Sequence, residues 1–104
     1  MAHYNEMKFT IPELKGISAK TTETHLKLYS GYVKFTNTIL DQIAELSKDS
    51  EKNAYALGEL QQRFGFEFDG MRNHEYFFQQ LENGSTTISE GALKQAIAAE
   101  WGSF

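Results

Sequence analysis

Two long stretches of the sequence carry apolar residues at three- and four-residue steps, one on each side of a polar segment, Ser47–Asn53. This spacing places the apolar side chains of each stretch along one face of a helix. The first stretch runs from about Ala19 to Ser47 and carries two stripes, Leu26, Tyr29, Val33, Thr36, Leu40 and Ile43, and Leu28, Tyr32, Phe35, Ile39 and Leu46. The second stretch carries Tyr55, Leu57, Leu60, Phe64, Phe68, Met71, His74, Phe78 and Leu81. The pattern predicts an all-α fold, an antiparallel hairpin of two long helices.

The ends of the two long helices have local signals. Ser18 is expected to be the N-cap of the first helix, because its hydroxyl can accept a hydrogen bond from the first turn. Asp49 or Ser50 is expected to cap the second helix. Glycines lie inside both helices. They favour a kink or a break at Gly31, and either a break or a helix held by packing between Gly65 and Gly70.

The remaining segments add a leader and a short C-terminal helix to the hairpin. A leader precedes Ser18, and its residues 8–16, which contain the only proline, Pro12, are expected to be extended chain. After a loop over residues 82–87, a last short helix is predicted to begin at Ser89 and to end at Gly102, a plausible C′ glycine. The whole chain, residues 1–104, is expected to be one domain.

Composition excludes several classes of function. The net charge of −4 argues against nucleic acid as a partner, since phosphate binding needs a basic face. The absence of cysteine excludes disulfides, thiolate metal sites and cysteine nucleophiles. No apolar run approaches the roughly 20 residues of a membrane span, and residues 1–10 lack the apolar core of a signal peptide. We therefore expect a soluble, cytoplasmic protein.

Two of the three histidines, His25 and His74, are predicted to lie at one level of the hairpin. Each is about 24 or 25 residues from a turn near residue 50, which corresponds to about 36 Å along a helix. His25 shares a helix face with Tyr29 and Tyr32, and His74 lies on an apolar stripe, so both rings are expected to point inward. The third histidine, His3, is expected to be solvated.

Two inward imidazoles are costly unless they are satisfied, either by ordinary hydrogen bonds within a core or by a metal ion. The core interpretation is the commoner one for a single inward histidine. Two histidines alone do not complete a catalytic metal site, which usually needs three or four protein ligands. A carboxylate-bridged metal bundle is disfavoured, because neither histidine has a glutamate three residues before it.

The second half of the chain has a series of specific motifs. They are Phe66-Glu67-Phe68-Asp69-Gly70-Met71-Arg72-Asn73-His74-Glu75-Tyr76-Phe77-Phe78, then Leu81-Glu82-Asn83-Gly84, and finally Ala96-Ile97-Ala98-Ala99-Glu100-Trp101-Gly102-Ser103-Phe104. This series resembles the N-terminal domain of the iron/manganese superoxide dismutases, with its Asn-His-aromatic block, Asn-Gly turn and Gly-Ser-Phe end. Upstream, Ile17-Ser18, His25 and Tyr32-Val33 also match, so the resemblance covers about residues 8–104.

The resemblance implies roles for four residues. His25 and His74 would be two ligands of a single iron or manganese ion, and Tyr32 or Tyr29 would be the tyrosine close to that metal. Tyr32 matches the family's Tyr-Val pair and is favoured, whereas Tyr29 matches helical spacing from His25. In the family, the metal converts superoxide to dioxygen and hydrogen peroxide.

Several positions depart from the family pattern. The first helix has one histidine where the family commonly has several, and the interval from His25 to Tyr32 is one residue shorter than usual. Phe78 stands where many members have tryptophan, and Met71 stands where many have histidine. The family also takes an aspartate and a third histidine from a C-terminal α/β domain with an Asp-x-Trp-Glu-His block, and this sequence contains no such block.

The resulting hypothesis is that this chain is the N-terminal half of a superoxide dismutase, inactive alone and holding metal weakly or not at all. Its partners would be superoxide and a C-terminal superoxide dismutase domain or a separate chain, within a homo- or hetero-oligomer. A dimer of this chain would bring four histidines together. The alternative is a non-catalytic helical assembly module that keeps the family fold and self-associates.

Overall fold

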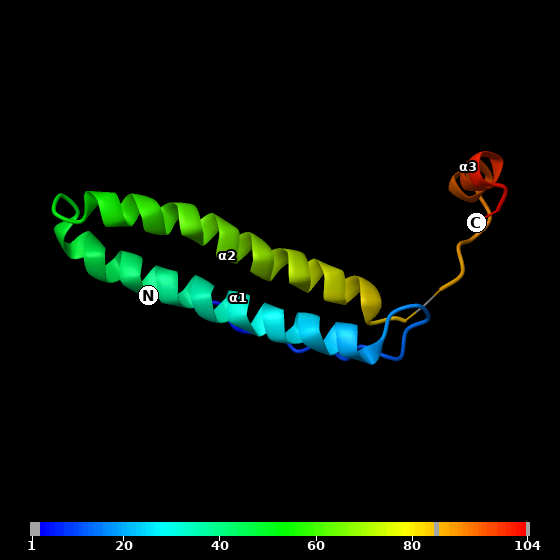
Figure 1. Cartoon of the computed structure of the whole chain (residues 1–104), viewed down its shortest axis with the longest axis horizontal. Helices are drawn as coiled ribbons and strands as arrows, with labels where there is room; N and C mark the ends of the chain where they lie inside the picture. Colours follow the sequence, from blue (N-terminus) through cyan, green and yellow to red (C-terminus); the bar gives the residue numbers. More distant parts are fainter. Residues whose placement is uncertain (1–2, 85, 104) are drawn as a thin grey trace.

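The computed structural model describes residues 3–84 and 86–103, and within these ranges the chain is helical with no β-strand. Two long helices, α1 (Ala19–Leu46) and α2 (Ala54–Leu81), lie antiparallel and side by side, joined by a short 3₁₀ helix, η1 (Ser47–Asp49) (Figure 1). A short helix, α3 (Ala92–Trp101), follows. The predicted all-α hairpin with a short C-terminal helix is therefore confirmed. Met1, Ala2, Ser85 and Phe104, which belong to the predicted leader, loop and C-terminal motif, lie outside the described residues.

Helix α1 begins and ends within one residue of the prediction. The Ser18 hydroxyl accepts a hydrogen bond from the Thr21 backbone N–H at 3.2 Å, so Ser18 is the N-cap that the sequence predicts. The helix continues through Gly31 to Leu46 without a break, and the prediction of a break at this glycine is wrong. Packing of one helix face against α2 outweighs the small intrinsic cost of a single glycine.

The turn differs from the prediction, because neither Asp49 nor Ser50 caps α2. Asn53 occupies the N-cap position and makes no side-chain cap bond. Its amide instead donates to the Leu46 carbonyl oxygen at 3.0 Å, while Asp49 Oδ1 accepts from the Lys52 backbone N–H at 3.2 Å. Both side chains thus close the turn itself, and α2 begins only at Ala54.

Helix α2 is unbroken through Gly65 and Gly70, which resolves the open choice in favour of a helix held by packing. A Cβ atom at Gly70 would lie only 2.4 Å from Cε1 of Tyr32, so this glycine is required for the tyrosine ring to rest on α2. No heavy atom lies within 4 Å of a Cβ built at Gly65. The first glycine therefore has no packing role, and the second has one.

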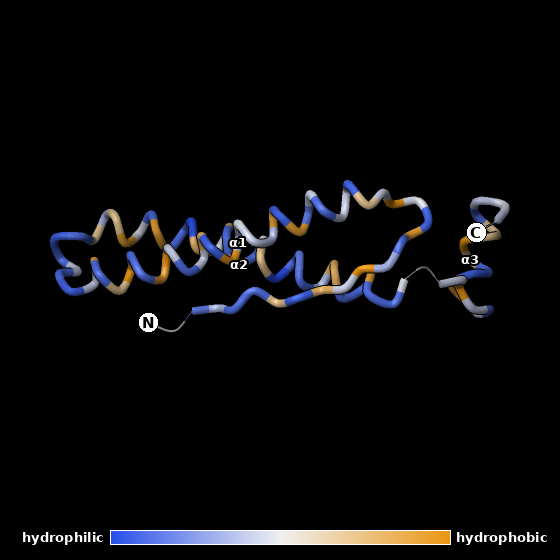
Figure 2. Tube along the Cα trace, turned by 90° about the horizontal axis from the view of Figure 1, so that it is seen from below, coloured by the Kyte–Doolittle hydropathy of each residue, from blue (hydrophilic) through white to orange (hydrophobic). Residues whose placement is uncertain are grey.

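The core lies at the end of the hairpin where α1 begins and α2 ends. Its buried side chains are Tyr29, Val33, Met71 and Phe78, and Tyr4, Phe9 and Ile11 of the leader pack against them. The leader runs antiparallel to α1 along the hairpin, below it in Figure 2, and its contacts move from Asn37 through Tyr29 to Glu82 as it proceeds. The leader is thus a third layer over one face of the two helices. Its course is extended up to Glu13, as predicted, but a turn at Lys15 and Gly16, closed by a bridge between Leu14 and Ile17, ends the extended stretch.

The two apolar stripes of α1 have different surroundings. The first is buried at Tyr29, Val33 and Thr36, as predicted. In the second, Leu28 and Phe35 are 48% and 50% exposed, so the prediction that this stripe widens the buried face is wrong at these two positions. The leader covers only one face of the hairpin, and the other face keeps apolar side chains at its surface.

Helix α3 begins at Ala92, three residues later than predicted, and ends at Trp101. The next residue is Gly102, whose φ of 84° is the left-handed conformation expected of a glycine that terminates a helix. Figure 1 shows α3 apart from the hairpin, and none of its residues is buried. Among the described residues, no helix combines the length and apolarity that a bilayer crossing needs.

Candidate functional site: a histidine pair across the hairpin

His25 of α1 and His74 of α2 face each other across the hairpin. His25 Nδ1 lies 3.3 Å from His74 Nε2, and the ring centroids are 5.5 Å apart. Both side chains are half-buried. The structure therefore brings together the two histidines that were predicted to lie at one level, whereas His3 is exposed and lies 2.7 Å from Asp41, near the C-terminal end of α1.

The hydrogen bonds of the pair define its tautomers. His74 Nδ1 lies 2.7 Å from the Gly70 carbonyl oxygen, which can only accept, so this nitrogen carries a hydrogen. In the neutral ring, Nε2 of His74 then has the free lone pair, and Nδ1 of His25 is the donor between the rings. A backbone carbonyl that holds one nitrogen and leaves the other free is the usual way in which proteins orient a metal-ligating histidine.

Tyr32 lies beside the pair. Its ring centroid is 5.3 Å from that of His74 and 6.1 Å from that of Phe66, and the side chain is half-buried. Gly70 makes this position possible, because any larger residue would displace the ring. Gly70 thus has two roles. Its lack of a side chain leaves room for the Tyr32 ring, and its carbonyl oxygen accepts the hydrogen bond from His74.

Tyr29 occupies a different place, on the side of the hairpin that the leader covers. It is 1% exposed, and its ring contacts Phe9 and Phe78 rather than either histidine. Its hydroxyl donates to Glu75 Oε2 at 2.7 Å and accepts from the Met7 backbone N–H at 2.9 Å. Burial, with the nearby Glu75 carboxylate, raises the pKa of Tyr29 to about 12, so the phenol is neutral at physiological pH.

Glu75 is a buried carboxylate that the sequence analysis did not single out. It is 3% exposed, follows His74 directly, and accepts from Arg72 Nη1 at 2.6 Å as well as from Tyr29. The hydrogen bond from Arg72 to this carboxylate raises the pKa of Arg72 above its ordinary value, so the guanidinium stays charged. A signal was available: Glu75 falls four residues after Met71 and three before Phe78, on the inward stripe, with an arginine three residues earlier.

The two imidazole nitrogens have the spacing of two ligands of one metal ion. Two nitrogens bound to one ion at about 2.1 Å each are roughly 3.0–3.4 Å apart in right-angled or tetrahedral arrangements. The two imidazole nitrogens have this separation, and His25 would bind an ion through Nδ1 in the tautomer that carries its hydrogen on Nε2. In the described parts of the chain, no group of three or more histidine, aspartate or glutamate side chains is positioned to hold an ion. The residues present fit two ligands of an ion, and further ligands must come from elsewhere.

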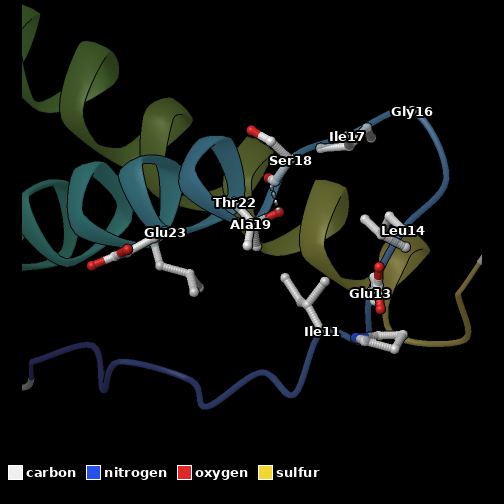
Figure 3. A pocket seen from close by; sticks show the side chains of 11 residues that line it. Ile11, Glu13, Leu14, Gly16, Ile17, Ser18, Ala19, Thr22 and Glu23 are labelled. Carbon is white, nitrogen blue, oxygen red and sulfur yellow. Dashed lines mark hydrogen bonds between the residues drawn. The ribbon is translucent and has the colours of Figure 1, made fainter.

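A pocket lies away from the histidines, at the N-terminal end of α1. It has a volume of about 850 Å³, lies between the leader loop and the first turns of the helix, and is partly open to solvent (Figure 3). Its lining residues include the apolar Ile11 and Leu26 and the acidic Glu13 and Glu23. No histidine lines it, so this pocket is not part of the paired-histidine site.

Comparison with known proteins adds no relative. No protein-family model, no curated protein and no solved structure matches the chain. The resemblance to the superoxide dismutases therefore depends on the motifs in the sequence.

Proposed function

We propose that this chain supplies two histidine ligands, His25 and His74, to the iron or manganese ion of a superoxide dismutase, and that another polypeptide segment supplies the remaining ligands. The observation that carries the proposal is the 3.3 Å approach of the two imidazole nitrogens from different helices. The family motifs around His74 support the choice of metal and substrate. Imidazole ligands completed by carboxylate and water suit iron and manganese.

The chain's own residues would bind the metal ion and orient its ligands and the nearby solvent or substrate. When bound, iron or manganese supplies one-electron oxidation and reduction of superoxide. The Gly70 carbonyl holds His74 with Nε2 directed toward His25, which fixes the direction of one ligand before any ion arrives. Tyr32, half-buried against His74, borders the same space and would position solvent or substrate there.

Two imidazoles leave most of the coordination shell unfilled, so the isolated chain should bind iron or manganese substoichiometrically and catalyse poorly. A C-terminal α/β domain, in the same or a separate polypeptide, would contribute the aspartate and the third histidine. A cytoplasmic location is part of this proposal.

A second candidate function is a non-catalytic assembly module that self-associates. It is favoured by the open face of the hairpin, which we define as the exposed apolar residues Leu28, Phe35, Phe66 and Phe77. Phe77 lies against His25 and Phe66 against Tyr32, so this face surrounds the histidine pair. Apolar patches of this kind commonly mark protein interfaces.

The test is to produce the chain together with the C-terminal α/β domain of an iron superoxide dismutase, and to measure bound metal and superoxide loss. We expect metal and activity only in the mixture, with both lost in His25→Ala and His74→Ala. Near-stoichiometric iron or manganese on the chain alone, or metal content in the mixture that ignores both substitutions, would contradict the proposal. Sedimentation of the chain alone tests the second candidate, and a monomer at micromolar concentration would remove it.

A further inference from the structure

The two buried carboxylates of α2 have partners in different places. Glu67, 5% exposed, accepts from Arg63 on its own helix, at 2.9 Å and 3.1 Å. Glu75 also has an arginine of its own helix, but its second oxygen reaches across to the Tyr29 hydroxyl of α1. Of these two carboxylates, only Glu75 joins the two helices.

This bond between helices lies next to the histidine pair. Glu75 is one residue beyond His74, and Tyr29 is four residues, about 6 Å or one turn, beyond His25. Consecutive residues of a helix are about 100° apart around its axis, so His74 points to one face of α2 while Glu75 points to another. Any rotation or slide of α2 that moved Glu75 relative to Tyr29 would also move His74 relative to His25.

The leader fixes the direction of the bond. The Met7 backbone N–H donates to the Tyr29 hydroxyl oxygen, so the hydroxyl hydrogen is free to point only at Glu75. Arg72 holds the other carboxylate oxygen and itself lies over the Tyr4 ring of the leader, with its guanidinium carbon 5.1 Å from the ring centroid. The leader therefore contacts both partners of the carboxylate.

We propose that Glu75 and Tyr29 are positioning residues, which hold His74 opposite His25 through their hydrogen bond, with the leader at Met7 completing the arrangement. This inference rests on the proposed function, because it concerns the metal-binding geometry of the same pair. Neither residue touches the metal or the substrate in this account.

The experiment uses Cu²⁺ as the probe, because it binds nitrogen ligands more tightly than the other divalent first-row ions. All variants carry His3→Ala, so that His25 and His74 are the only imidazoles in the chain. Affinity is measured by titration, and the ligand geometry by the hyperfine pattern of the electron paramagnetic resonance spectrum. Far-UV circular dichroism checks that each variant is folded.

Tyr29→Phe removes one hydroxyl and keeps the buried ring. We expect about a 10-fold loss of Cu²⁺ affinity, at the low end of what loss of a group orienting a ligand costs, and a changed hyperfine pattern. Tyr4→Phe is the matched control, since it also removes a hydroxyl from a ring packed on this core, and it should stay within about 2-fold. Glu75→Gln and Glu67→Gln form a second matched pair with the same expected contrast.

The outcomes separate the two proposals. If Cu²⁺ affinity is unchanged by His25→Ala and His74→Ala, the proposed function fails and this inference fails with it. If both histidines are needed but Tyr29→Phe keeps the affinity within 2-fold and the same spectrum, this inference alone is wrong. Should Tyr29→Phe not fold, Met7→Pro, at a residue 42% exposed, removes the same N–H donor from outside the core and must shift the spectrum for the inference to hold.

Discussion

The two ends of the hairpin are built from the same two helices, yet they are packed differently. At the histidine end, Tyr29, Met71 and Phe78 are at most 1% exposed, beneath aromatic residues of the leader. At the turn end, residues 40–64 include no buried residue, and Tyr55 is 84% exposed. Two helices can pack their apolar side chains against each other, but the sides of this contact stay open to solvent. A third layer is needed before the side chains become fully buried.

The difference indicates where the free energy of unfolding is concentrated. Apolar burial is the main favourable contribution to folding, so the end covered by the leader should be the stable part of the hairpin. That end also holds His25 and His74. We therefore expect the packing around the histidine pair to depend on the leader, which packs against Tyr29 and Phe78.

The largest expected effect is at the centre of this core. Phe78→Ala should lower the free energy of unfolding by about 3–5 kcal/mol, because the side chain is completely buried and its removal leaves a cavity. Tyr55→Ala, at the turn end, should change it by less than about 0.5 kcal/mol. Urea unfolding followed by circular dichroism measures both, and similar losses at the two sites would break the comparison.

An intermediate effect is expected from two glycines of α2. Gly70→Ala would place a methyl group against the Tyr32 ring and should cost about 1–3 kcal/mol, reduced by the better helix propensity of alanine. Gly65→Ala meets no neighbouring atom and should stabilise the protein by up to about 1 kcal/mol. Thermal unfolding of the two variants gives the sign of each change, and a stabilised Gly70→Ala would show that Tyr32 does not need this glycine.

The smallest expected effect is a loss of stability in alkali. The pKa of Tyr29 is 10.0 when unperturbed and about 12 in the folded protein, so the folded state favours the neutral phenol. The resulting stability is complete below pH 10 and is lost as the pH rises toward 12, by about 1 kcal/mol at pH 11. Tyr29→Phe lacks the titrating group, so its Tm should approach that of the natural protein over this range. A constant difference in Tm from pH 9 to 12 would argue against a buried hydroxyl.

Much of the fold follows from local patterns in the sequence. Helical spacing located α1 and α2, Ser18 and Gly102 marked helix ends by their capping chemistry, and equal distances from the turn placed His25 opposite His74. These signals are local or depend only on the rise per residue of a helix. They do not depend on which other segments, such as the leader, pack against the hairpin.

The features that were missed depend on contacts between distant segments. Leu28 and Phe35 are exposed because the leader covers only one face of the hairpin. The spacing of apolar residues within α1 does not indicate which face the leader covers. Gly70 is poor for a helix by propensity, and its value appears only when the Tyr32 ring is in place. Glu75 was overlooked because its partner Tyr29 is 46 residues away in the sequence.

Helix α3 carries the only tryptophan of the chain, Trp101, and its side chain is 76% exposed. Its fluorescence should therefore report the environment of α3 and stay nearly constant while the hairpin unfolds, so emission alone would give a misleading denaturation curve. The same insensitivity makes it a clean optical reporter. A shift of its emission to shorter wavelengths on mixing with a second polypeptide would show that α3 has been covered, without any added label.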